Sequence, residues 1–172
     1  PIFVKPSNSG SSIGISKVSE KSGVIQALKK ASEIDSRIVV EEGLDVRELE
    51  CGIMGYSDLL TSEIGEVIYS ADWYDYESKY SKNNKINIPA DIDSEMTQKV
   101  KNIAIQSCKA LNVYGFARID FFLEKSSNKI FLNEINTIPG FTNNSMFPLL
   151  WGASGLNIDH LVAKLVDISL VF

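Results

Sequence analysis

The chain has 172 residues, of which 44% are hydrophobic and 23% charged, and this composition excludes a disordered or collagen-like protein. Its 17 basic and 22 acidic residues give a formal net charge of -5, which disfavours a nucleic-acid-binding protein because such proteins need a basic surface. No apolar run approaches the ~20 residues that cross a bilayer, so we expect no membrane-spanning segment. Two cysteines and one histidine suit a reduced, cytoplasmic protein better than a disulfide framework or a histidine-based zinc cluster.

The periodicity of apolar residues predicts strands and helices in irregular alternation. Expected strands cover residues 3–5, 15–18, 37–42, 46–54, 65–70, 116–123 and 129–136, and expected helices cover residues 23–33, 94–112, 147–154 and 158–170. Ser22 is the expected cap of the first helix. Hairpins mixed with helices favour an α+β class with a mostly antiparallel sheet. Because the chain begins with Pro1 and a strand already under way, we interpret it as part of a longer protein.

Two segments lack clear periodicity. Ser7–Gly14 (SNSGSSIG) is a loop of small residues that follows Lys5, so its backbone N–H groups, its hydroxyls and a nearby ammonium could bind phosphate. A plain hairpin tip is the more common meaning of such a loop, and the Gly-Lys-Ser/Thr signature of a P-loop is missing. Residues 71–89 are rich in tyrosine and amide side chains, and a stretch of this length without periodicity is more often a functional loop than a core element.

A predicted hairpin near the C-terminal end carries the most informative polar residues. Side chains alternate along a strand, so Arg118 shares a face with Asp120, and Glu134 shares a face with Asn136. If the hairpin turns about Ser127, the pairing of its two strands places these residues side by side. The predicted cross-strand pairs are Asp120 with Glu134, Arg118 with Asn136, and Phe122 with Leu132.

Two carboxylates that lie directly opposite each other repel unless a cation lies between them. The oxygen ligands of Asp120, Glu134 and Asn136 suit Mg²⁺ or Mn²⁺ rather than zinc or copper. The alternative is a solvated polar face on which Arg118 bridges the two acids. Together with the small-residue loop, the set favours binding of nucleotide phosphates.

Five motifs occur in one order along the chain: VKPSNSGSSIGISKV (4–18), EEGLDVRELE (41–50), YDYESKY (74–80), ARIDFF (117–122) and NEINTIPGFTNNSMFP (133–148). Together they resemble the D-alanine–D-alanine ligases, members of the ATP-grasp superfamily, from end to end of the chain. The resemblance implies that residues 1–48 are the later part of the ATP-grasp central domain and residues 49–172 the C-terminal domain, with the N-terminal domain absent from this sequence.

The same resemblance implies an ATP-dependent ligase of peptidoglycan precursor synthesis in the cytoplasm. It would join two D-alanine molecules through an acyl phosphate, with ATP and two Mg²⁺ or Mn²⁺ ions. We expect the chain alone to be inactive, because the site for the first D-alanine lies largely in the missing sequence. A homodimer of the full-length protein is left open, and neither nucleic acid nor membrane is an expected partner.

Site residues follow from the matched motifs. For the nucleotide, the resemblance assigns Lys5 and Lys79 to the phosphates, Ser12 to the flexible loop, Glu41 to the adenine amino group, Leu44 to the hinge beside the base, and Glu48 to the ribose hydroxyls. For catalysis, it assigns Ser11 and Tyr80 to a hydrogen-bonded lid that also carries Lys79, Arg118 to the transferred phosphoryl group, and the Gly140 N–H to the oxyanion. Asp120, Glu134 and Asn136 match the magnesium ligands, and Ser145 and Met146 match the pair that binds the second substrate's carboxylate.

Three alternatives remain open at this point. Members of the same family make D-Ala–D-Ser or D-Ala–D-Lac, although Tyr80 and Met146 resemble the dipeptide-forming, D-Ala-selective enzymes. The chain could also be a nucleotide-binding module without turnover. Another ATP-grasp carboxylate–amine ligase is disfavoured by the YDYESKY and PGFTNNS segments.

Overall fold

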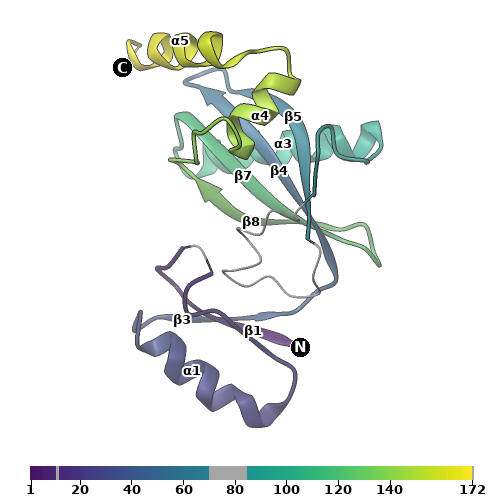
Figure 1. Cartoon of the computed structure of the whole chain (residues 1–172), viewed down its shortest axis with the longest axis vertical. Helices are drawn as coiled ribbons and strands as arrows, with labels where there is room; N and C mark the ends of the chain where they lie inside the picture. The colour runs from purple at the N-terminus through teal and green to yellow at the C-terminus, as the bar shows by residue number, and fades with distance from the viewer. Residues whose placement is uncertain (11, 70–84, 172) are drawn as a thin grey trace. The chain divides into compact units, whose positions relative to one another are not determined.

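The computed structural model describes residues 1–10, 12–69 and 85–171 (Figure 1). The chain divides into two compact units, the first made of Pro1–Asp45 and Tyr69–Lys85 and the second of Val46–Ile68 and Ile86–Phe172. Each unit has its own antiparallel sheet, and helices pack on both sheets. This arrangement confirms the predicted α+β class. Which ATP-grasp domain each unit represents stays a prediction.

The first unit is a small sheet with one helix against it. Its strands are β1 (Ile2–Pro6), β2 (Ser16–Val18) and β3 (Ile38–Glu42), in the order β2-β1-β3. Helix α1 (Val24–Ser32) buries Ala27 and Ala31 against Val4 and Val18. The small side chains of these alanines allow a close approach of the helix to the valines of the sheet.

The predicted cap of this helix is wrong. Lys21–Gly23 forms a single 3₁₀ turn, η1, ahead of α1, and Gly23 takes the cap position without any side-chain hydrogen bond. The Gly23 N–H donates to the Glu20 carbonyl at 3.0 Å, so the turn provides an acceptor for one of the N–H groups that lack a partner at a helix start. Ser22 therefore lies inside a turn, one residue too early to act as the cap.

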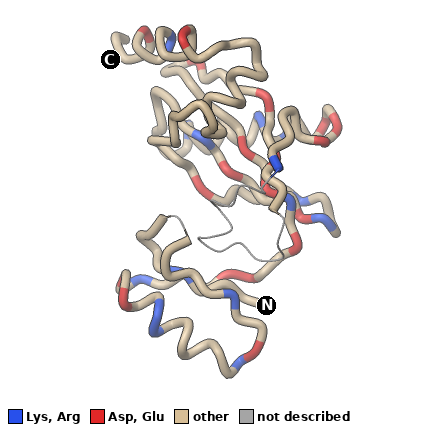
Figure 2. Tube along the Cα trace, viewed as in Figure 1, with Lys and Arg blue, Asp and Glu red and all other residues tan. Residues whose placement is uncertain are grey.

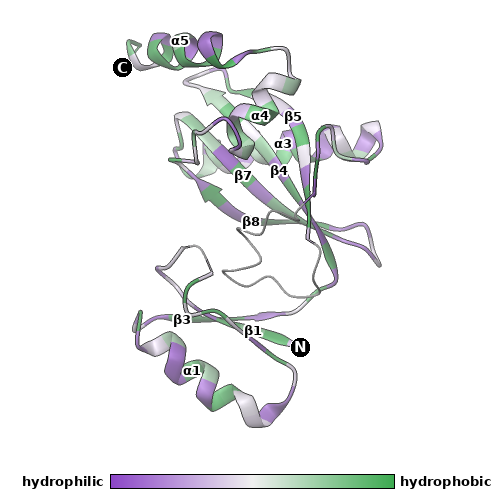
Figure 3. Ribbon diagram, in the orientation of Figure 1, coloured by the Kyte–Doolittle hydropathy of each residue, from purple (hydrophilic) through white to green (hydrophobic). Residues whose placement is uncertain are grey.

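The second unit is built on a five-stranded sheet. The strands are β4 (Val46–Gly55), β5 (Leu60–Ile68), β6 (Lys85–Asn87), β7 (Gly115–Glu124) and β8 (Ile130–Asn136), in the order β6-β5-β4-β7-β8. The three helices are α3 (Ser94–Ala110), α4 (Met146–Ala153) and α5 (Ile158–Ser169). Hydrophobic and hydrophilic residues alternate along the strands, as expected for a sheet with one face packed on a core (Figure 3).

Helices cover the two faces of this sheet unequally. On one face, α3 packs Val100, Ala104 and Cys108 onto Leu49 and other strand residues, which together form the largest core cluster. On the opposite face, α4 and α5 pack near Met54, where Phe147, Trp151 and Leu161 are buried. Helix α4 also packs on β5, where Leu150 and Met146 approach Gly65. The remainder of the second face carries the polar residues described below.

Three predicted details of the second sheet are wrong. Lys85–Asn87 lies inside the segment 71–89, where the sequence predicts a loop, but it forms the edge strand β6. Strand β5 begins at Leu60 rather than at residue 65. Its pairing with β4 has a bulge between Cys51 and Ile53, which interrupts the alternation of the first residues of β5 on which the prediction depended. A second bulge, between Asp120 and Phe121, shifts the pairing of β7 with β8. The cross-strand pairs beyond this bulge are Phe121 with Leu132 and Phe122 with Phe131, in place of the predicted pair of Phe122 with Leu132.

Both cysteines lie in the α3 core, and their thiols should be unreactive. Burial raises the pKa of the Cys51 thiol to about 12 and that of Cys108 to about 11. We expect no labelling by a thiol reagent at pH 8 in the native protein and rapid labelling in denaturant. Above about pH 9 the thiols of the unfolded chain bind fewer protons than the buried thiols of the folded protein. The free energy of unfolding should therefore fall as the pH rises from about 9 to about 12. Fast labelling of native Cys51 would contradict this packing.

Candidate functional site

A row of acidic residues crosses three neighbouring strands of the second sheet. The strand register places Glu50 of β4 opposite Asp120 of β7, and Asp120 opposite Glu134 of β8. Two residues along, Arg118 lies opposite Asn136. The acidic segments on adjacent strands are visible in Figure 2. The predicted pairs of Asp120 with Glu134 and of Arg118 with Asn136 are therefore confirmed.

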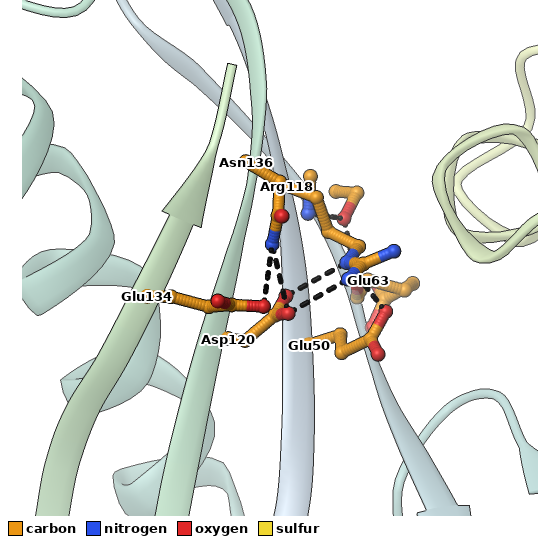
Figure 4. A network of polar contacts seen from close by, with 8 residues as sticks. Glu50, Glu63, Arg118, Asp120, Glu134 and Asn136 are labelled. Carbon is orange, nitrogen blue, oxygen red and sulfur yellow. Dashed lines mark hydrogen bonds and ion pairs between the residues drawn. The ribbon is translucent and has the colours of Figure 1, made fainter. Parts of the chain in front are cut away.

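Hydrogen bonds and an ion pair tie this row into one network (Figure 4). Arg118 donates from Nε to Asp120 Oδ1 and from Nη2 to Asp120 Oδ2, both at 2.7 Å. The same Nε lies 2.8 Å from Glu50 Oε2. Asn136 donates from Nδ2 to Asp120 Oδ2 at 2.9 Å and to Glu134 Oε1 at 3.3 Å. The two acids that Arg118 bridges are therefore Asp120 and Glu50, in place of the pair of Asp120 and Glu134 considered from the sequence.

The charge of Arg118 is fixed by this setting. Burial by itself lowers the pKa of the guanidinium, but its hydrogen bonds to Asp120 and the negative charges of Glu50, Asp120 and Glu134 raise that pKa above its ordinary value. Three carboxylates therefore face one permanent positive charge. The excess of negative charge on the sheet face is what would attract a divalent cation.

The donor set fits magnesium or manganese better than zinc. Within the described residues, no three His, Cys, Asp or Glu side chains are arranged to hold a metal ion. Asp120 and Glu134 supply two carboxylates, and a half-turn of the Asn136 amide would present Oδ1 in place of the donating Nδ2. Mg²⁺ is commonly held by one or two carboxylates while water and substrate phosphates complete its shell. The set is therefore suited to a cation that arrives with a nucleotide.

A second group of predicted residues meets in the loop between β8 and α4. A Cβ atom placed on Gly140 would lie 3.0 Å from Ser145 Oγ, so these two residues are in close contact. Ser145 Oγ accepts from the Thr142 N–H at 3.0 Å and lies 2.8 Å from Thr142 Oγ1, which fixes the hydroxyl at the start of α4. Met146 is buried beneath the loop, where its sulfur would lie 3.1 Å from a Cβ on Gly65.

The remaining predicted residues lie mostly in the first unit. Lys5 Nζ forms an ion pair with Glu41 Oε2 at 2.6 Å, which joins two residues that the resemblance assigns to opposite ends of the nucleotide. Ser12 adopts a positive φ of 60°, and Leu44 is half-buried. Glu48 lies in the second unit, on the same face of β4 as Glu50. Ser11, Lys79 and Tyr80 lie outside the described residues.

Glu50 is the residue of this network that sequence reasoning left without a role. The alternation of β4 does place it on the face of Glu48, opposite the buried side chains of Leu49 and Cys51. That β4 pairs with β7 could not be read from the chain, because about sixty residues separate the two strands and such pairings depend on tertiary structure.

No described helix is both long enough and apolar enough to span a bilayer.

Comparisons with known proteins agree on one family. Residues 1–167 match the family described as "D-ala D-ala ligase C-terminus". The chain is 75% identical over 170 residues to a D-alanine--D-alanine ligase of Prochlorococcus marinus strain MIT 9215, which covers 99% of this chain and 48% of that protein. It is 49% identical to the ligase of strain NATL2A, with 98% of this chain and 49% of that protein covered.

Solved structures give the same result. The structure is similar to that of the VanG D-Ala:D-Ser ligase from Enterococcus faecalis, with a TM-score of 0.88 and 37% identity over 98% of this chain and 49% of that one. The D-alanine-D-alanine ligase from Coxiella burnetii follows at a TM-score of 0.84 and 33% identity, over 97% of this chain and 44% of that one. These likenesses confirm the predicted ATP-grasp fold.

The chain spans about half the length of the curated relatives it matches. Since the family match runs over residues 1–167, the chain belongs to the D-alanine–D-alanine ligase C-terminal family.

Proposed function

We propose that this chain is the nucleotide-binding and second-substrate-binding part of an ATP-dependent D-alanine–D-alanine ligase of peptidoglycan precursor synthesis in the cytoplasm. The proposal rests on one observation above the others. Asp120, Glu134, Asn136 and Arg118 meet on one sheet face, in a chain that belongs to this ligase family.

In the proposed reaction, the carboxylate of a first D-alanine attacks the γ-phosphorus of ATP and forms an acyl phosphate. The amine of a second D-alanine then attacks the acyl carbon, and phosphate leaves the tetrahedral intermediate. Phosphoryl transfer depends mainly on positioning and on neutralisation of negative charge. Arg118 would supply a fixed positive charge beside the transferred group, and Lys5 would supply another once it exchanges Glu41 for a phosphate oxygen.

Asp120, Glu134 and Asn136 would hold the one or two magnesium or manganese ions. Bound there, such ions would neutralise charge on the phosphates. The fit of the donor set described above supports this assignment. The network also supports the Arg118 role, because a guanidinium already surrounded by carboxylates is kept charged and close to where those ions would lie.

The loop before α4 would bind the second D-alanine. The Gly140 N–H would stabilise the oxyanion, and Ser145 would bind the substrate's carboxylate beside the apolar side chain of Met146. Contact between Gly140 and Ser145 supports a single subsite, since both groups must reach one small substrate. Ser11, Lys79 and Tyr80 would close the site from the lid, and Ser12, Glu41, Leu44 and Glu48 would contact the nucleotide.

A D-Ala–D-Ser ligase is the second candidate. The likeness to the VanG D-Ala:D-Ser ligase at a TM-score of 0.88 favours it. Met146 argues for D-Ala, because a buried thioether offers an apolar wall to the substrate's methyl group and only a weak acceptor to a hydroxyl.

The complete protein that carries this chain should release phosphate from ATP when given D-alanine. We expect the highest kcat/KM with D-alanine as second substrate, then D-serine, then D-lactate, and no turnover by residues 1–172 alone. Phosphate release and the ligated products would be measured for each pair. Highest activity with D-serine would support the second candidate, and ligase activity of the isolated chain would contradict the need for further sequence.

A further inference from the structure

Glu50 is a buried acid with a specific partner. Its side chain is 12% exposed, and its Oε2 lies 2.8 Å from Arg118 Nε. An ionised carboxylate with so little access to water is destabilising unless a positive charge or hydrogen-bond donors compensate it. Arg118 supplies that compensation from the neighbouring strand, β7.

Arg118 is shared between two acids. Its Nε and Nη2 bind both oxygens of Asp120 at 2.7 Å, while Nε also faces Glu50. The strand register explains the geometry, because Glu50 and Asp120 are directly opposite each other and Arg118 lies two residues away on the same face. A small movement of one guanidinium could therefore favour either carboxylate.

This sharing matters for the cation proposed above. A guanidinium bound to both oxygens of Asp120 competes with a divalent cation for this carboxylate, because both positive groups bind the same oxygen lone pairs. Asp120 becomes a better metal ligand if Arg118 has another partner. Glu50 is within reach, since its Oε2 already lies 2.8 Å from Arg118 Nε.

We propose that Glu50 is a positioning residue, which holds the Arg118 guanidinium when Asp120 turns to the cation. This role rests on the proposed function, since it requires a cation at Asp120 and Glu134. Glu50 acts through Arg118 and touches neither the cation nor the substrates. Its negative charge also keeps Arg118 beside the site after the exchange, where a phosphate would meet it.

The test is a titration with Mn²⁺ of the complete protein with a non-hydrolysable ATP analogue bound, followed by electron paramagnetic resonance, because phosphate oxygens complete the shell of the cation. We expect Glu50→Gln to weaken Mn²⁺ binding about tenfold, the size typical of changes at residues behind metal ligands. Glu124→Gln is the matched control, because it removes one acid from the same sheet at the far end of β7, where Glu124 accepts from Ser127 Oγ. The control should stay within about twofold of wild type.

A double-mutant cycle separates positioning from simple loss of charge. In an Arg118→Met background no guanidinium competes for Asp120, so Glu50→Gln should change Mn²⁺ affinity by less than about threefold. An equal effect of Glu50→Gln with and without Arg118 would overturn the proposal, as would a Glu50→Gln protein that matches the Glu124→Gln control.

Two further outcomes are distinguishable. Failure of the wild-type protein to bind Mn²⁺ would overturn the cation site itself, and the role of Glu50 with it. Thermal melting of the metal-free proteins checks that the variants fold. If Glu50→Gln does not fold, Glu50→Asp replaces it, since that variant keeps the charge but retracts it from Arg118 and should still weaken Mn²⁺ binding. Wild-type affinity in Glu50→Asp would then refute the proposal.

Discussion

Replacing Glu134 with glutamine is expected to weaken the binding of magnesium–ATP by about 10- to 100-fold in the complete protein. Glutamine keeps the size of the side chain and one ligating oxygen but removes the charge that a divalent cation requires. Glu134 is exposed and lies at the edge strand β8, so its replacement should leave the free energy of unfolding nearly unchanged.

Calorimetric titration with ATP at fixed magnesium would measure this effect. Glu124→Gln again provides a control with the same change of charge on the same sheet, and it should bind like wild type. Equal nucleotide affinity in Glu134→Gln and wild type would refute the metal role of Glu134. Loss of affinity together with a lower melting temperature would instead show that the residue supports the fold.

Replacing Phe147 with alanine should lower the free energy of unfolding of the second unit by about 3–5 kcal/mol. Phe147 is fully buried in the α4 helix, with ring centroids 5.6 Å from Phe116, 5.9 Å from Phe141 and 6.3 Å from Trp151. Removing its ring leaves a cavity among three aromatic side chains that cannot all move inward, which is why the expected cost is high.

The same change should affect the second-substrate loop, because α4 begins directly after Ser145. We expect the KM for the second D-alanine to rise more than the KM for ATP. Denaturant unfolding and initial-rate kinetics would measure the two effects.

Leu149→Ala, on the exposed side of the same helix, is the matched control and should lower the free energy of unfolding by less than about 1 kcal/mol. Similar stabilities of the Phe147 and Leu149 variants would contradict the packing described for α4. If Phe147→Ala does not fold, Phe147→Leu should show a smaller loss in the same direction.

The pairing of Asp120 with Glu134 was predictable because a short turn joins β7 to β8, and a hairpin with few loop residues has few registers to choose from. The buried face of α3 was predictable in part, since helical periodicity marks the buried Val100 and Ala104 as core positions but also marks Leu111, which is 63% exposed. Both predictions depend on interactions between residues that are near in the sequence.

The errors have a common cause in bulges and turns. The bulge between Asp120 and Phe121 depends on how β8 packs beside β7, and no residue type in the two strands indicates its position. The 3₁₀ turn ahead of α1 likewise displaced the cap from Ser22 to Gly23. The bulge and the 3₁₀ turn are both local backbone conformations that the packing of the whole unit selects.

The sequence by itself determined the α+β class, the ligase family and the acid–amide face of the last hairpin, because short-range periodicity and ordered motifs carry that information. Only the tertiary structure decided that Glu50 joins the row of acids and shares Arg118 with Asp120. The physical reason is that β4 meets β7 through backbone hydrogen bonds between distant segments. Such bonds are available to any strand, so the choice of partner is made by the burial of the whole sheet rather than by the residues that end up side by side.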